Sequence, residues 1–389
     1  MKQCHFGCSK PSIHAIELLP ILLHSEKPEQ GKTLSNMASS VDIVVPVWNN
    51  PFEARACIAA ILAYSGDVRL IVVDNGSSRE TELMLEEFSE SMGERGLFIK
   101  SERNIGVVAA INLGLARSDS DYTVIVRPDV KVHSGWLEPL VSAAEAGGAG
   151  IVSPLFNGVS APKLPTLKHG CRVMESCTVS FATLLVRTEM RMVAGLFDDT
   201  LDGGDWCLRE YVRRVAAFGY RTCITGRCSL TCYGGKQFGS AQRRNEMIQN
   251  SRAAYISKWG IDRHYSVYFG PEAEAGALAD TVAVILNGAR QGHRFTLLLH
   301  RRQYSFFRKM GWNALHTGIE LLPLSLLFPL RNLQKKISVL RDASPDLLAV
   351  KGCSGTLFPR MDAAISCDEL FDSFGTNQPQ LHVPSGAIP

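Results

Sequence analysis

VDIVVPVWNN, residues 41–50, opens the alternation of strands and helices that decides the fold. Its unbroken apolar run is typical of a parallel strand that helices cover on both faces. Asn50 before Pro51 then marks the start of a helix. Three further predicted strands follow, with helical stretches between them: VRLIVVD (68–74), LFIKSE (97–102) and YTVIVRPD (122–129). This alternation predicts an α/β protein with a right-handed, doubly wound sheet.

The alternation loosens after residue 150 and resumes near residue 263. SCTVSFATLLVRTEM (176–190) is predicted to be a strand that runs into a turn, and the acidic loop, residues 198–206, precedes an amphipathic helix. Four more predicted strands follow residue 262: RHYSVYFG (263–270), FTLLLHRR (295–302), TGIELLPLS (317–325) and PDLLAVKG (345–352). They predict a second, Rossmann-like α/β half-domain over residues 263–389.

The composition is that of an ordinary globular chain. Of the 389 residues, 46% are hydrophobic and 20% charged, and the formal net charge is only +3. Basic residues form short clusters, which gives no reason to expect nucleic acid as a partner. Eleven cysteines, odd in number and scattered, favour a reducing cytoplasm over a disulfide framework. Cys223, Cys228 and Cys232 lie close together without a CxxC pair, so buried thiols are favoured over zinc.

No segment is a predicted membrane span. AIELLPILL (15–23) and ELLPLSLLFPL (320–330) are too short and contain proline. Arg331, Lys335 and Lys336 follow the second stretch, which leaves peripheral contact with the inner face of a membrane open. A buried strand with its following helix is the favoured interpretation. Residues 1–40 are predicted to be a disordered tail, with Met37 as an alternative start of translation.

Polar side chains stand where three of the predicted strands end. In open α/β sheets, ligands bind outside the carboxyl ends of the strands. Asp74 could accept a hydrogen bond from a nucleobase, and Asp129 offers a hard oxygen to Mg²⁺ or Mn²⁺. Other residues at these ends or near them could border a nucleotide sugar: Pro46, Asn49, Asn75, Asn104, Gly106, Asn112 and Arg127. The first strand is not followed by GxGxxG, so a dehydrogenase type of dinucleotide site is excluded.

Seven segments occur in an order that resembles glycosyltransferase family 2. They are VDIVVPVWNN, IVVDNGSS, RNIGVVAAINLGLA, YTVIVRPDV, FATLLVRTEMRMVAGLFDD, DWCLR and KWG. The resemblance covers about residues 41–260 and implies a GT-A fold over residues 41–262 with inverting transfer from a nucleotide-diphosphate sugar. It also implies that Asp74 contacts the nucleobase, that Asp129 binds the metal, and that a carboxylate of the acidic loop acts as base.

The chain departs from the family pattern at three positions. Arg127 stands where the metal motif has an acid or an amide, so Mg²⁺ or Mn²⁺ is expected to be weakly bound or dispensable. Glycine occupies the favoured base position, 203, which leaves Asp202 and Asp205 as candidate catalytic residues. Cys232 replaces a histidine that often precedes the glycines of the late loop.

Two functions remain open from the sequence. The first is a cytoplasmic inverting glycosyltransferase that acts on a polysaccharide or a lipid-linked glycan, as in cell-wall biogenesis. The alternative is a non-catalytic nucleotide-sugar-binding or scaffolding protein derived from such an enzyme. Residues 263–389 resemble the N-terminal half of a GT-B enzyme of family 4, which alone implies a docking or acceptor-side module. A sugar nucleotidyltransferase is disfavoured, because VPVWNNPFEAR is not its glycine-rich, basic loop.

Overall fold

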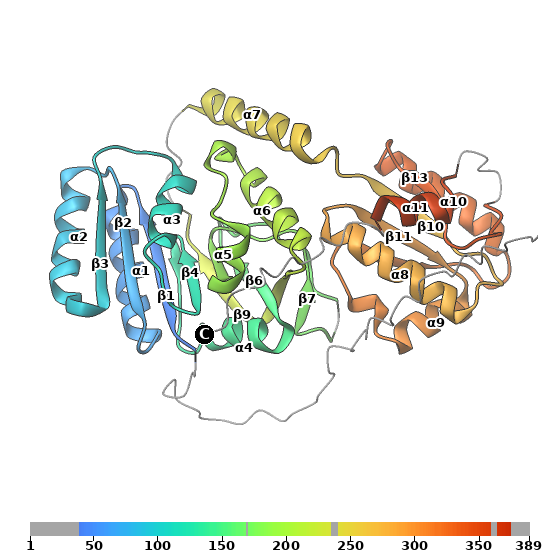
Figure 1. Ribbon diagram of the computed structural model, residues 1–389, viewed down its shortest axis with the longest axis horizontal. Helices are drawn as coiled ribbons and strands as arrows, with labels where there is room; N and C mark the ends of the chain where they lie inside the picture. Colours follow the sequence, from blue (N-terminus) through green and yellow to red (C-terminus); the bar gives the residue numbers. More distant parts are fainter. Residues whose placement is uncertain (1–38, 169, 235–239, 359–363, 375–389) are drawn as a thin grey trace, which may run out of the picture. The chain divides into compact units, whose positions relative to one another are not determined.

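The computed structural model describes residues 39–168, 170–234, 240–358 and 364–374, all of which belong to one compact unit (Figure 1). The expected disordered tail lies outside these ranges except for its last two residues, and so does the stretch after residue 374. No helix in the described ranges has the length and apolar character needed to cross a membrane.

A nine-stranded sheet occupies the first part of the described chain. Its first four strands run parallel in the order β3-β2-β1-β4: β1 is Val41–Val47, β2 Arg69–Asn75, β3 Gly96–Ser101 and β4 Tyr122–Val126. The rest of the sheet is mixed, with β8 (Thr183–Arg187) antiparallel to β4, followed by β6 (Ala149–Asn157) and β9 (Arg221–Cys232). The short strands β5 (Val130–Lys131) and β7 (Val173–Glu175) pair with β9.

Helices cover both faces of this sheet, as the apolar run of β1 predicted. Alternate residues of β1, such as Ile43 and Val45, join one core with Ile58, whereas Val44 joins another with Ala110. The helices are α1 (Pro51–Tyr64), α2 (Arg79–Met92), α3 (Val107–Leu115), α4 (Glu138–Gly147), α5 (Thr188–Ala194), α6 (Trp206–Ala217) and α7 (Ala241–Trp259), with 3₁₀ turns η1 (Gly93–Arg95) and η2 (Asp199–Leu201). The predicted strand and helix alternation over residues 41–129 is therefore confirmed.

A second, four-stranded parallel sheet follows residue 263. Its order is β12-β11-β10-β13, with β10 at His264–Tyr268, β11 at Arg294–Leu299, β12 at Ile319–Pro323 and β13 at Leu348–Lys351. The helices are α8 (Ala275–Arg290), α9 (Arg301–Lys309), α10 (Pro329–Ala343) and α11 (Cys367–Phe374), and η3 spans Trp312–Ala314. Val267 and Tyr268 belong to separate cores, so this sheet also has two covered faces. A second α/β region is thus present, as predicted.

Two predicted boundaries were wrong. The strand expected over residues 295–302 ends at Leu299, and Arg301 and Arg302 begin α9. The cause is local, because the backbone N–H of His300 donates to Oε1 of Gln303 at 3.0 Å, a bond that starts a helix. The turn expected after Arg187 is the helix α5, and the strand β8 begins only at Thr183.

The apolar stretch 320–330 is divided between the interior and the surface. Leu324 is buried after β12, but Leu326, Leu327 and Phe328 are 73%, 79% and 61% exposed. The predicted strand and helix are present as β12 and α10, but β12 is mostly half-buried and Leu326, Leu327 and Phe328 are exposed, so the predicted burial was only partly right.

Candidate active site

The carboxyl ends of β1, β2 and β4 form what we call the strand-end edge, which carries Asn49, Asp74, Arg127 and Asp129. The three strands are adjacent and parallel, so their ends lie on one edge of the sheet. Asp74 lies opposite Val47 at this edge and is only 1% exposed. Its Oδ1 accepts the backbone N–H of Ser77 at 2.9 Å, whereas its Oδ2 is buried and has no hydrogen-bond partner. A buried acceptor without a donor raises the free energy of the folded state unless another donor reaches it.

Asn49 holds the loop after β2 in place. Its backbone N–H donates to Oγ of Ser77 at 2.9 Å, and its side-chain Oδ1 accepts the N–H of Ser78 at 2.8 Å. Asn49 has a φ of 56°, in the left-handed region that asparagine tolerates. Pro46, the other residue predicted to border the donor, is buried in β1 opposite Val73. Asn49 thus shapes the strand-end edge through its backbone and its side chain, and Pro46 through the backbone of β1.

Asn75 connects the end of β2 with the start of α3. Its Nδ2 donates to the carbonyl oxygen of Gly106 at 3.0 Å and to Oδ1 of Asn104 at 3.3 Å, and its Oδ1 accepts the N–H of Ile105 at 2.9 Å. Oδ1 of Asn104 also accepts the N–H of Gly106 at 2.9 Å. Asn75, Asn104 and Gly106, which were predicted to border a nucleotide sugar, thus lie together. Their polar groups form hydrogen bonds with one another.

Asp202 reaches the same point from the acidic loop. Its Oδ2 accepts the N–H of Val107 at 2.9 Å and its Oδ1 that of Val108 at 3.3 Å, so it caps the N-terminus of α3. Gly106 has a φ of 95°, and a Cβ there would collide with the carboxylate of Asp202. Burial raises the pKa of Asp202 to about 6, against the two amides, which lower it.

A second contact fixes the acidic loop on α3. Asn112 donates from Nδ2 to the carbonyl oxygen of Phe197 at 2.9 Å and accepts the N–H of Phe197 on Oδ1 at 3.1 Å. Asn112 therefore holds the main chain just before the acidic loop. The side-chain amide of Asn112 thus bonds the main chain of Phe197. Asn112 was predicted to border the nucleotide sugar, and this role stays a prediction.

Gly203 explains the glycine at the favoured base position. Its N–H donates to Oγ of Ser251 on α7 at 3.0 Å, and a Cβ there would collide with the carbonyl of Met247. A carboxylate side chain at position 203 is incompatible with α7 in this place. Asp205 stands at the start of α6, is exposed, and makes no side-chain bond to the helix N-terminus. Of the two candidate catalytic acids, Asp205 is thus the one free of an amide partner.

Arg127 and Asp129 form an ion pair at the end of β4. Nη2 of Arg127 donates to Oδ2 of Asp129 at 2.8 Å, and Nε of Arg127 donates to Oδ1. Asp129 is 6% exposed; burial lowers the pKa of Arg127, but Asp129 and the nearby Cys232 together raise it on balance. The end of β9 lies alongside, because the N–H of Tyr233 donates to the carbonyl oxygen of Asp129 at 3.0 Å and Cys232 pairs with Val130.

The side chains at the strand-end edge do not fit the expected Mg²⁺ or Mn²⁺ site. Both oxygens of Asp129 accept from Arg127, and a divalent cation prefers several hard oxygen ligands. Within the described ranges, no three His, Cys, Asp or Glu side chains are grouped so that they could hold a metal ion. This also applies to Cys223, Cys228 and Cys232, which are buried on β9 as thiols.

Sequence reasoning missed Ser77 and Ser251, which hold the site from the loop after β2 and from α7. The turn sequence NGSS could have indicated Ser77, since serine in such turns bonds nearby backbone groups. Ser251 gives no signal, because its partner Gly203 is 48 residues earlier.

The chain is similar in sequence to known glycosyltransferases. Residues 42–186 match the family described as Glycosyl transferase family 2. Glycosyltransferase AglE of Haloferax volcanii is 24% identical over 236 residues, which are 57% of this chain and 75% of that protein. An N-acetylglucosaminyltransferase of Azorhizobium caulinodans is 30% identical over 113 residues, 28% of either chain. The crystal structure of GalNAc-T7 with UDP, GalNAc and Mn²⁺ is 13% identical, with a TM-score of 0.49, over 57% of this chain and 48% of that one.

The family and sequence matches support a glycosyltransferase enzyme whose first α/β region has the GT-A fold. The resemblance of residues 263–389 to half of a GT-B enzyme stays a prediction.

We predict that Mn²⁺ does not stabilise the protein and that Arg127→Asn changes this. The substitution frees the carboxylate of Asp129 and adds an amide oxygen, so Mn²⁺ should raise the melting temperature of the variant by a few degrees. Thermal unfolding with MnCl₂ and with EDTA measures the difference. Arg127→Lys keeps a cation beside Asp129 and should not respond. A wild-type shift as large as that of Arg127→Asn would contradict the assignment.

Proposed function

We propose that the chain transfers a sugar, with inversion at the anomeric carbon, from a nucleoside diphosphate to a hydroxyl group of a polysaccharide or a lipid-linked glycan. The observation that carries the proposal is the strand-end edge with the unpartnered Oδ2 of Asp74. A nucleobase N–H would satisfy this oxygen, whose burial without a partner costs about 1–3 kcal/mol.

Arg127 would balance the charge of the diphosphate. Asp129 accepts hydrogen bonds from Nε and Nη2 of Arg127, whereas Nη1 of Arg127 has no acceptor among the described residues. The side chain of Arg127 is 38% exposed, and its remaining N–H groups would donate to phosphate oxygens. The ion pair with Asp129 orients the guanidinium while leaving donors for the ligand.

Asp205 is the proposed base. Its carboxylate would take the proton of the acceptor hydroxyl while the acceptor oxygen forms a bond to the anomeric carbon. The bond from that carbon to the diphosphate oxygen breaks at the same time, and the diphosphate leaves with the electron pair. Asp202 is proposed as a positioning residue, because its oxygens bond the amides of Val107 and Val108.

A nucleotide-sugar-binding protein without turnover is the second candidate. Three observations favour it: Gly203 is packed against α7, Asp202 caps α3, and Asp129 is paired with Arg127. In each case, a position that the family resemblance links to catalysis or metal binding is occupied by a structural contact. The effect of replacing Asp205 on turnover therefore distinguishes the two functions.

We predict that Asp205→Asn lowers the release of nucleoside diphosphate from the donor at least about 100-fold, because a general base contributes roughly 10²–10⁴ in rate. Donor hydrolysis and transfer are measured with a panel of nucleotide sugars, and donor affinity is measured by calorimetry. Affinity should stay within about twofold of the wild type, since Asp205 does not contact the donor. Donor binding without turnover in the wild type would establish the second candidate instead.

Asp202→Asn is the matched control for Asp205→Asn, because it removes the same charge three residues earlier in the same loop. Because the pKa of Asp202 is raised in the fold to about 6, the folded state binds its proton more tightly than the unfolded state does. The stability of the wild type relative to this variant should therefore fall as pH rises from about 4 to 6, by about 1–2 kcal/mol after allowance for partial exposure. Urea unfolding at several pH values measures the difference, and a rise in this window would contradict the raised pKa, because it would show that the two amides outweigh burial.

The exposed segment Leu326–Phe328 is a proposed site of peripheral membrane contact. Leu326 and Leu327 line a surface concavity together with Arg301 and Lys336. Arg331 lies over the ring of Phe328 at 5.6 Å. Apolar side chains flanked by cations are suited to the interface of an anionic bilayer. Such contact would bring the chain to a lipid-linked acceptor.

We predict that Leu326→Asp with Leu327→Asp lowers co-sedimentation with phosphatidylglycerol vesicles several-fold, because two exposed apolar groups are replaced by anions. Met192→Asp with Val193→Asp is the control, since these residues are also exposed but lie on α5. Equal partitioning of the wild type and both variants would end the membrane proposal.

A further inference from the structure

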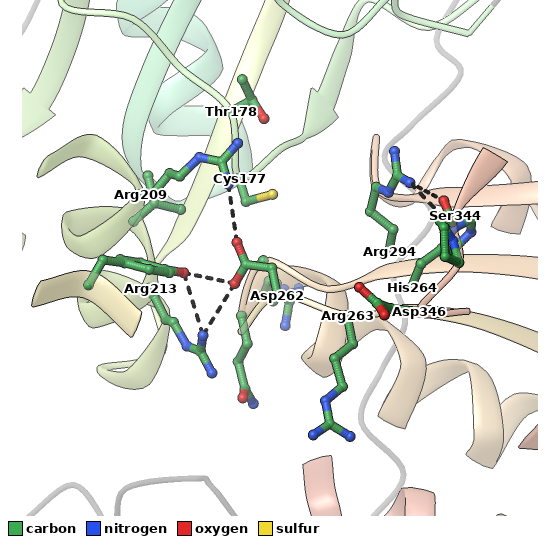
Figure 2. A pocket seen from close by; sticks show the side chains of 16 residues that line it. Cys177, Thr178, Arg209, Arg213, Asp262, Arg263, His264, Arg294, Ser344 and Asp346 are labelled. Carbon is green, nitrogen blue, oxygen red and sulfur yellow. Dashed lines mark hydrogen bonds and ion pairs between the residues drawn. The ribbon is translucent and has the colours of Figure 1, made fainter. Parts of the chain in front are cut away.

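A cavity of about 410 Å³ lies away from the strand-end edge (Figure 2). We call it the arginine cavity, because arginine is its most frequent lining residue: Arg209, Arg213, Arg263, Arg290 and Arg294. These side chains come from α6, from the segment before β10, from the end of α8 and from β11. None of the residues proposed above to contact the donor lines it. Its volume is within the range of about 300–1,000 Å³ that is usual for small-molecule sites.

Three of the arginines have carboxylate partners. Arg209 and Arg213 both reach Asp262, at 3.2 and 3.5 Å, and Figure 2 shows these bonds. Arg290 forms a two-pronged ion pair with Glu175, at 2.6 and 2.8 Å. These pairs fix one wall of the cavity and neutralise part of its charge.

Arg263 and Arg294 have no ion pair with any described carboxylate. Nη2 of Arg294 lies 3.3 Å from Nδ1 of His264 and from Oγ of Ser344, both neutral partners (Figure 2). Both arginines are exposed, so each keeps N–H donors for a ligand. The cavity, which Asp346 also lines, therefore combines a wall of paired arginines with two arginines that have no ion pair among the described residues.

Histidines near the cavity respond to its positive charge. Burial, together with the charges of Arg213 and Arg263, lowers the pKa of His293 to about 4. Burial also lowers the pKa of His264, with Arg294 acting in the same direction. Both imidazoles are thus neutral near pH 7, and the local field favours an anion.

Two helices connect the cavity with the acidic loop. Arg209 lies one turn after Asp205, whose carbonyl oxygen accepts the N–H of Arg209 at 3.0 Å. On α7, Tyr255 donates its hydroxyl to Oδ1 of Asp262 at 2.9 Å, one turn after Ser251, the partner of Gly203. An anion in the cavity would thus contact the elements that hold the acidic loop.

We propose that the arginine cavity binds the phosphate of a phosphorylated ligand, at a site separate from the strand-end edge. Guanidinium groups match phosphate oxygens in geometry and charge, and Arg263 and Arg294 supply the unpaired donors. The ligand is a phosphate ester or a diphosphate, either free in solution or as the headgroup of a lipid. The site does not depend on turnover, so it stands even if the protein proves to be a binding protein.

The test is calorimetric binding of two probes, inorganic pyrophosphate and a short-chain prenyl monophosphate, to the full chain. Arg263→Gln with Arg294→Gln should weaken binding about tenfold or more, because two charge-assisted contacts are lost. The control is Arg302→Gln with Arg308→Gln on α9, which removes the same charge from exposed arginines outside the cavity. The control should bind within about twofold of the wild type.

The relative affinity of the probes identifies the source of the phosphate. Tighter binding of the prenyl phosphate points to a lipid headgroup, and equal or tighter binding of pyrophosphate points to a free ligand. Absence of binding by both probes would overturn the proposal. So would equal losses in the two double variants, which would show non-specific charge attraction, or unchanged binding after the loss of Arg263 and Arg294.

Discussion

The carboxylate of Asp202 accepts the first two amides of α3, and the arrangement of the site depends on this contact. A helix N-terminus has unpaired N–H groups and a partial positive charge, so a carboxylate there is held by hydrogen bonds and by the helix dipole. Because Gly106 has no side chain, the carboxylate can approach closely. The acidic loop is thereby tied to α3, and α3 is tied to the end of β2 through Asn75.

This tie has a chemical consequence. A carboxylate that caps a helix is a structural group first, which leaves the neighbouring Asp205 as the exposed acid of the two candidate catalytic residues. Asp129, at the end of β4, is likewise a carboxylate with a structural partner, because it orients Arg127. Two positions that the family resemblance assigned to catalysis and metal binding thus hold other groups in place.

The sequence predicted the parts of the fold that depend on local pattern. The apolar run of β1 indicated a strand covered on both faces, and the strand order places Asp74 and the end of β4 before Asp129 on one edge of the sheet. It did not predict the partner of Asp202, because Val107 lies 95 residues earlier and no local signal links them. Nor could it predict the arginine cavity, whose walls come from segments up to 169 residues apart, from Cys177 to Asp346. The roles of the candidate site residues stay predictions.

Binding of a nucleoside diphosphate to Asp74→Ala tests the central claim most directly. Calorimetry with UDP, GDP, ADP and CDP on the wild type should identify one ligand, and Asp74→Ala should weaken it about tenfold or more, since a charged acceptor of a ligand N–H is lost. Asp67→Ala, an equal change at an exposed acid before β2, should leave the affinity unchanged. Undiminished affinity in Asp74→Ala would show that the nucleotide binds away from the strand-end edge, and the account would be wrong.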